Sequence, residues 1–115
     1  MAAVIEQRPS PQSSTFLNRL PRVALKAFCA RWHVSYLAFF GSVLRSDFGP
    51  DSDIDIIMDF DPGHVPGIEF VTLCEELTAI LGHRVDVLTR TGLEAAPESS
   101  LKRRIQKSAQ PIYER

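Results

Sequence analysis

Residues 39–58 read FFGSVLRSDFGPDSDIDIIM. An apolar run ends in this stretch at the pair Gly41-Ser42, and a second apolar run begins with Asp53-Ile54-Asp55. Between them lies a linker rich in Gly, Pro, Asp and Ser, residues that are typical of turns and loops. The pattern predicts two strands joined by a loop, with polar side chains at both ends of that loop.

The composition is that of an ordinary globular domain. The chain has 115 residues, of which 44% are hydrophobic and 23% charged, and its formal net charge is −1. This length suits one domain, and the near-neutral charge argues against a wide basic surface for nucleic acids. No apolar run approaches the roughly 20 residues that span a bilayer, and no secretory signal is visible. We therefore expect a cytoplasmic protein without membrane or direct nucleic-acid contacts.

Hydrophobic periodicity and turn residues divide the chain into a leader over residues 1–14 and one domain over residues 15–115. Helices are expected over about 20–32, 68–81 and 98–108, and strands over 34–40, 53–60 and 84–89. A short helical turn capped by Ser42 is expected over 42–47, a loop over 92–98, and a terminal strand or tail over 111–114. This order predicts an α/β fold, with a small mixed β-sheet flanked by helices.

Two aspartates at the start of the second strand are candidate metal ligands. Successive strand side chains point to opposite faces, so Asp53 and Asp55 are expected to share one face. Carboxylates this close repel each other unless a cation neutralises them, and such oxygen ligands suit Mg²⁺ or Mn²⁺. Asp86, alone in an apolar strand, would join them if the two strands are neighbours. Three carboxylates could then hold two metal ions for an in-line displacement at phosphorus, with Asp86 nearest the attacking hydroxyl.

The pair Gly41-Ser42 at the other end of the loop suits the phosphates of a nucleotide. A glycine lets a phosphate approach the backbone, and the N–H groups of a following helical turn can bind an anion. The Ser42 hydroxyl can add one hydrogen bond. Arg45, one turn later, either reaches the triphosphate or pairs with Asp47. We predict that Gly41, Ser42 and Arg45 bind the phosphates.

Each of these signals also has an ordinary structural explanation. Aspartate at a strand start is often a turn residue, and a Gly-Ser pair before a short helix is often only a cap. Asp59 and Asp61 are expected to form a solvated strand end. The basic residues of the last helix, Lys102, Arg103, Arg104 and Lys107, are expected to form a solvated face or to meet an acidic partner surface. The functional interpretation therefore depends on the joint occurrence of the motifs.

Taken together, these residues resemble the signature of minimal nucleotidyltransferases, small members of the DNA polymerase β-like nucleotidyltransferase superfamily. The resemblance rests on Gly41-Ser42, Arg45, Ser52 and Asp53-Ile54-Asp55, and continues through Pro62-Gly63, Pro66-Gly67, Val85–Thr89 and Ile112-Tyr113-Glu114. It implies the polymerase β-like nucleotidyltransferase fold, Asp53, Asp55 and Asp86 as an intact set of metal ligands, and ATP as the substrate with Mg²⁺ as the cofactor.

The resemblance also implies an acceptor. Relatives typically transfer AMP from ATP to a hydroxyl, and many act as antitoxins that adenylylate a tyrosine of a HEPN-type toxin. We therefore expect a HEPN-type toxin as the partner, in a homo- or hetero-oligomer. Two alternatives stay open: an antitoxin that neutralises its partner by binding alone, and nucleotidyl transfer to a small molecule.

Overall fold

The computed structural model describes residues 3–4, 16–45 and 48–115. Its sheet has five strands in the order β1-β5-β2-β3-β4: β1 (Ala3–Val4), β2 (Val34–Phe40), β3 (Ile54–Phe60), β4 (Val85–Thr89) and β5 (Gln110–Glu114). All neighbouring strands are antiparallel except β3 and β4, which are parallel. The helices are α1 (Arg22–Arg31), α2 (Phe70–Leu81), α3 (Arg90–Ala95) and α4 (Ser100–Ser108), with 3₁₀ turns η1 (Leu17–Arg19) and η2 (Gly41–Leu44). The predicted α/β fold with a small mixed sheet is confirmed.

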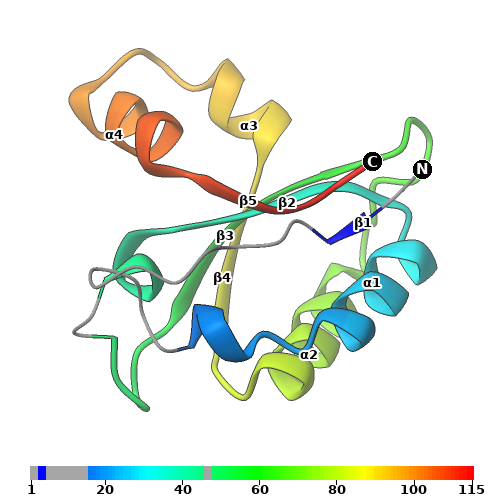
Figure 1. The fold of residues 1–115 in the computed structure, drawn as a ribbon. Helices are drawn as coiled ribbons and strands as arrows, with labels where there is room; N and C mark the ends of the chain where they lie inside the picture. The colour runs from blue at the N-terminus through cyan, green and yellow to red at the C-terminus, as the bar shows by residue number, and fades with distance from the viewer. Residues whose placement is uncertain (1–2, 5–15, 46–47) are drawn as a thin grey trace.

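The sheet lies between two pairs of helices. Figure 1 shows α1 and α2 against one face and α3 and α4 over the other. On β3, Ile54, Ile56 and Met58 pack into the core together with α1 and α2. Because strand side chains alternate, Asp55 and Ile57 point to the face beneath α3 and α4. No helix in the described part of the chain is long and apolar enough to cross a membrane.

Most predicted elements occur within two residues of their predicted bounds. The reason is clear in α2, where Leu73, Leu77 and Leu81 follow helical spacing and are all buried. This helix ends before Gly82, whose N–H donates to the carbonyl of Thr78 at 2.8 Å. Segments with such periodicity or a clear stop signal were therefore predictable from the sequence.

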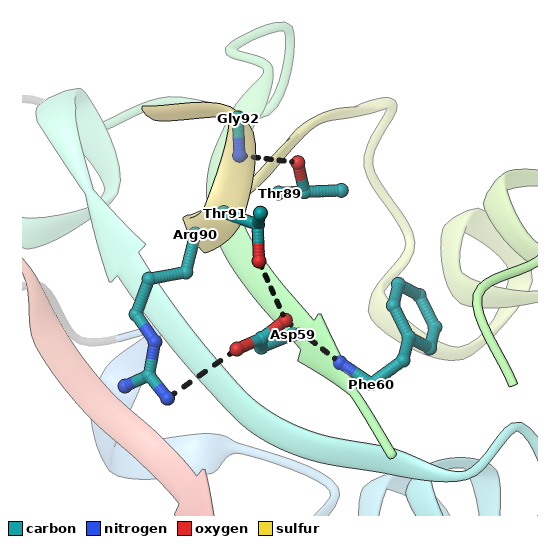
Figure 2. A network of polar contacts seen from close by, with 6 residues as sticks. All are labelled: Asp59, Phe60, Thr89, Arg90, Thr91 and Gly92. Atoms are coloured by element: carbon teal, nitrogen blue, oxygen red, sulfur yellow. Dashed lines mark hydrogen bonds and ion pairs between the residues drawn. The ribbon is translucent and has the colours of Figure 1, made fainter. Parts of the chain in front are cut away.

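One helix was not predicted. The segment expected to be a loop over 92–98 contains most of α3, which starts at Arg90, directly after β4. The hydroxyl of Thr89 caps this helix by accepting a hydrogen bond from the Gly92 N–H at 3.0 Å (Figure 2). A side chain at Gly92 would place its Cβ 2.8 Å from that hydroxyl oxygen, so the close approach favours glycine. A helix of 6 residues is too short to show a helical period.

The prediction that Ser42 caps the turn after β2 is wrong. The turn η2 begins one residue earlier, its cap position is Phe40, and no side chain caps it. Gly41 has a φ of 76°, and this left-handed conformation reverses the chain as it leaves β2. Ser42 therefore lies inside the turn, and its hydroxyl is not used for capping.

The predicted leader stays a prediction for most of residues 1–14, because only Ala3–Val4 falls within the described residues. These two residues form β1, which pairs antiparallel with β5 through Ala3–Glu114 and Val4–Tyr113. The first described residues of the chain thus lie at the edge of the sheet.

Lys102 differs most from its predicted place on a solvated face. It is only 6% exposed, and its Nζ donates to the carbonyls of Glu94 at 2.9 Å and Ala96 at 2.8 Å. Nζ also lies 3.1 Å from the Glu98 carboxylate. The ammonium thus binds carbonyls at the end of α3, which have no partner within their own helix. It ties α3 to α4 above the sheet.

We expect the substitution Lys102→Met to lower the free energy of unfolding by about 2 kcal/mol, because it removes the charged donor of two part-buried hydrogen bonds to the carbonyls of Glu94 and Ala96. Urea unfolding followed by circular dichroism measures this loss. The matched control is Arg103→Met on the same helix, where the side chain is exposed and only approaches Glu98 at 4.0 Å. Equal midpoints for the two variants would contradict the structural role of Lys102.

Candidate active site

The sheet face beneath α3 and α4 presents its side chains in three rows, because β2, β3 and β4 lie side by side in register. The first row holds Phe40, Asp55 and Asp86, the second Ala38, Ile57 and Leu88, and the third Tyr36, Asp59 and Arg90. Rows are two residues apart along a strand, or about 7 Å. The first row thus holds two carboxylates beside a phenylalanine, the second row apolar side chains, and the third row a mixed polar group.

Asp55 and Asp86 are paired residues on the parallel strands β3 and β4. Neighbouring strands lie about 4.8 Å apart, so the two side chains stand next to each other on one face. Burial raises the pKa of the Asp55 carboxyl, and the charges of Asp86 and Asp53 raise it further. The positive charge of Arg45 acts in the opposite direction. Negative charge is therefore concentrated around Asp55, where a cation would relieve the repulsion.

Asp53 is positioned differently from the other two aspartates. It lies one residue before β3, and its Oδ1 is 3.3 Å from Nε of Arg84, which lies one residue before β4. Both side chains are exposed, so this ion pair is weak and easily exchanged. Within the described ranges, no three side chains of His, Cys, Asp or Glu are already close enough together to hold a metal ion. A metal site that uses all three aspartates therefore requires at least one of their side chains to move.

Gly41 packs directly against Asp55. A Cβ atom at position 41 would lie 2.5 Å from Oδ2 of Asp55, which is closer than real Cβ contacts allow. The end of β2 and the start of β3 are thus adjacent, as the pairing of Phe40 with Asp55 also records. Within residues 39–58, the Gly-Ser turn and the Asp-Ile-Asp motif therefore lie next to each other, with Gly41 against the carboxylate of Asp55.

A hollow beside the Gly-Ser turn is lined by Arg104, a residue outside the motifs that predict the phosphate site. It has a volume of about 520 Å³ and lies between η2 and α4. Gly41, Arg45 and Arg104 line it, together with apolar residues of both elements. The expectation that Arg104 belongs to a solvated face is therefore incomplete. The sequence spacing of 59 residues between Arg45 and Arg104 offered no signal that they would meet.

Asp59 was expected to lie at a solvated strand end, and that expectation is wrong. Its Oδ2 lies 3.4 Å from Nη2 of Arg90, and its Oδ1 accepts from the Phe60 N–H at 3.1 Å and from the Thr91 hydroxyl at 3.5 Å (Figure 2). Arg90 and Thr91 follow β4, so the sequence alone did not place them beside Asp59.

Sequence relatives carry the name of one enzyme class. Protein adenylyltransferase MntA of Thermococcus cleftensis is 34% identical over 76 residues, which are 65% of this chain and 75% of that protein. A Methanocaldococcus jannaschii protein, provisionally named protein adenylyltransferase MJ1379, is 38% identical over 64 residues. Those residues are 55% of this chain and 64% of that protein.

Solved structures share the fold. A structure provisionally described as a minimal nucleotidyltransferase aligns with a TM-score of 0.63 and 27% identity, over 90% of this chain and 100% of that chain. A toxin–antitoxin structure with AMP-PNP aligns with a TM-score of 0.62 and 18% identity, over 84% of this chain and 75% of that chain. A toxin–antitoxin MntA-HpeT structure, with two aspartates two positions apart exchanged for glutamate, aligns with a TM-score of 0.57 and 17% identity. It covers 79% of this chain and 70% of that one.

The family model for the nucleotidyltransferase domain matches residues 22–112 of the chain. This range includes all of α1, α2, α3 and α4, strands β2, β3 and β4, and the three aspartates of the candidate site. The resemblance drawn from the Gly-Ser and Asp-Ile-Asp motifs is thus confirmed, and the chain belongs to the nucleotidyltransferase domain family.

Proposed function

We propose that this nucleotidyltransferase moves AMP from ATP to a hydroxyl of a partner protein, a tyrosine of a HEPN-type toxin, and so acts as an antitoxin. The observation that carries the proposal is the placement of Asp55 beside Asp86 and against Gly41. The names of the relatives as protein adenylyltransferases support AMP as the transferred group. The toxin–antitoxin structures, one of them with AMP-PNP, support ATP and a toxin partner.

The donor atoms of the site fit a divalent cation. Asp55 and Asp86 offer carboxylate oxygens side by side, and Asp53 adds a third carboxylate when it exchanges Arg84 for the metal. Hard cations such as Mg²⁺ and Mn²⁺ prefer such ligands. When bound, one or two of these ions would polarise the α-phosphate and stabilise the charge that develops in transfer.

Different residues of the site have different roles in the reaction. Gly41, Ser42 and Arg45 bind the β- and γ-phosphates, so the bond between the α-phosphorus and its bridging oxygen breaks toward η2. The acceptor oxygen attacks the α-phosphorus from the opposite side, near Asp86. Asp86 accepts the hydroxyl proton, the new phosphodiester forms, and pyrophosphate leaves.

The direct test uses ATP labelled at the α-phosphate, Mg²⁺ and the protein encoded next to this chain in its genome. We expect label on a tyrosine of that protein, and no label when Asp53 and Asp55 are both changed to alanine. Absence of label with Mg²⁺ and with Mn²⁺, or full labelling by the double variant, would refute the proposed activity.

We expect Arg104→Ala to raise the KM for ATP by about fivefold, or about 1 kcal/mol, with kcat nearly unchanged. The reason is that Arg104 and Arg45 line the same hollow beside Gly41, so both side chains can bind the triphosphate. Steady-state AMP transfer at varied ATP measures the change. Arg103→Ala, one residue away on α4, should leave KM at the wild-type value. An unchanged KM for Arg104→Ala would exclude this role.

A second candidate function, neutralisation by binding alone, is favoured by three exposed apolar side chains. Val65, Ile68 and Val71 are 64%, 92% and 67% exposed at the start of α2 and in the segment before it. Exposed apolar groups of this kind suit a protein partner, here the toxin. The Asp53→Ala/Asp55→Ala variant separates the two functions. If it still neutralises the toxin at equal dose, binding suffices; if it does not, catalysis is required.

A further inference from the structure

We propose that the cavity over the second and third rows of the sheet binds the nucleoside of the donor nucleotide and selects adenine. The cavity has a volume of about 440 Å³, and its lining includes Tyr36, Ile57, Asp59, Arg90, Gln106 and Ala109. This size falls in the range of small-molecule sites. The inference rests on the proposed function, because the nucleotide is placed by its α-phosphate at Asp55.

The direction of the reaction constrains the path of the nucleoside. An in-line displacement uses the β2 side of Asp55 for pyrophosphate, at Gly41, and the β4 side for the acceptor, at Asp86. The nucleoside must leave this axis at an angle. Along β3, the second and third rows follow beneath α3 and α4, about 7 and 13 Å from Asp55. A ribose and its base span that distance, and the cavity lies there.

The third row offers a flat and rigid surface for a base. The guanidinium of Arg90 lies 4.1 Å from the centre of the Tyr36 ring, and Asp59 holds its Nη2 at 3.4 Å. Figure 2 shows Asp59 fixed in turn by Thr91 and the backbone of Phe60. The Arg90 side chain is still 41% exposed. Bases stack readily on arginine planes, so Arg90 can present a preorganised platform.

The polar edge of the cavity favours adenine. Gln106 comes from α4, is exposed and lines the cavity. A glutamine carboxamide has one acceptor and two donors, and it pairs with the exocyclic amine and an adjacent ring nitrogen of adenine. On the edge formed by N7 and the exocyclic group, adenine presents an acceptor and a donor, whereas guanine presents two acceptors and lacks that pair of contacts. Ile57, Leu93 and Ala109 form an apolar part of the wall for the base, and Glu94 lines the cavity as well.

The kinetic test compares Gln106→Leu with Lys107→Leu, an exposed neighbour on α4 that is not among the residues lining this cavity. We expect Gln106→Leu to raise the KM for ATP about tenfold and to reduce the preference for ATP over GTP by a similar factor. Both variants should keep the wild-type kcat and unfolding midpoint. Unchanged KM and unchanged nucleotide preference in Gln106→Leu would overturn the inference.

A second test does not require transfer. The full chain is irradiated with 8-azido-ATP, and labelled peptides are mapped by mass spectrometry. We expect label on the peptides that contain Tyr36, Arg90 or Gln106, competition by ATP, and loss of label in Ala109→Phe, which fills the cavity. Label confined to other peptides would overturn the inference. Correct labelling in a protein that never transfers AMP would instead refute the proposed function and leave the nucleoside site standing.

Discussion

Asp55→Asn is expected to lower the rate of AMP transfer by about a thousandfold, or about 4 kcal/mol in activation free energy. Asparagine keeps the size of the side chain but removes the charge that stands beside Asp86 and faces Gly41. A carboxamide is a poor ligand for Mg²⁺ next to one remaining carboxylate. Single-turnover transfer of labelled AMP measures the loss separately from product release.

The stability of the same variant provides the control. Burial and the charges of Asp86 and Asp53 raise the pKa of Asp55, so its charged form is disfavoured in the folded chain. Removing that charge should leave the thermal midpoint unchanged or raise it. Asp51→Asn, an exposed carboxylate in the loop before β3, should keep both activity and midpoint. A loss of activity that merely follows a loss of folding in Asp55→Asn would contradict the catalytic assignment.

Gly41→Ala is expected to reduce transfer at least a hundredfold, because it acts on the site in two ways. The added Cβ would lie 2.5 Å from Oδ2 of Asp55, so the carboxylate must move away to reach an ordinary van der Waals distance. The backbone at Gly41 has a φ of 76°, which costs a residue with a side chain about 1–2 kcal/mol. Transfer assays and urea unfolding measure the two effects.

The substitution Gly63→Ala separates the backbone strain of a side chain at positive φ from the steric contact with Asp55. Gly63 has a φ of 81°, but a Cβ there would have no atom within 4 Å. We expect this variant to lose only the roughly 1–2 kcal/mol that the left-handed backbone conformation costs, and to keep its activity. If both variants retain transfer, or both lose it equally, the packing of Gly41 against Asp55 does not control the site.

Local signals accounted for much of the fold. The spacing of Leu73, Leu77 and Leu81 predicted α2, and the apolar run ending at Gly41 predicted β2. Short elements defined by a single contact were predicted less well: most of α3 was expected to be a loop, and the turn after β2 was expected over 42–47 instead of Gly41–Leu44. The start of α3 depends on the Thr89 cap, and η2 depends on the left-handed conformation of Gly41. Neither contact leaves a periodic pattern in the sequence.

The candidate site likewise combines features that the sequence predicted with features that it did not. The sequence predicted Asp53, Asp55 and Asp86 as candidate metal ligands, provided that their two strands are neighbours. The pairing of β3 with β4 meets that condition. Their roles as ligands stay predictions. The ion pair that holds Asp53 at Arg84, and the place of Arg104 beside Arg45, were not foreseen. Such contacts join residues from separate elements, and no local spacing encodes them.

By itself, the sequence determined the class of the fold, the family and the residues that carry charge at the site, because helical period, strand alternation and motif spacing are local properties. The tertiary structure decided which of these residues meet. Pairing in parallel register sets Asp55 beside Asp86, the antiparallel return of β2 brings Gly41 against Asp55, and α4 brings Arg104 to the same end. The Gly-Ser and Asp-Ile-Asp motifs of residues 39–58 meet only because backbone hydrogen bonds between β2 and β3 align the two strands.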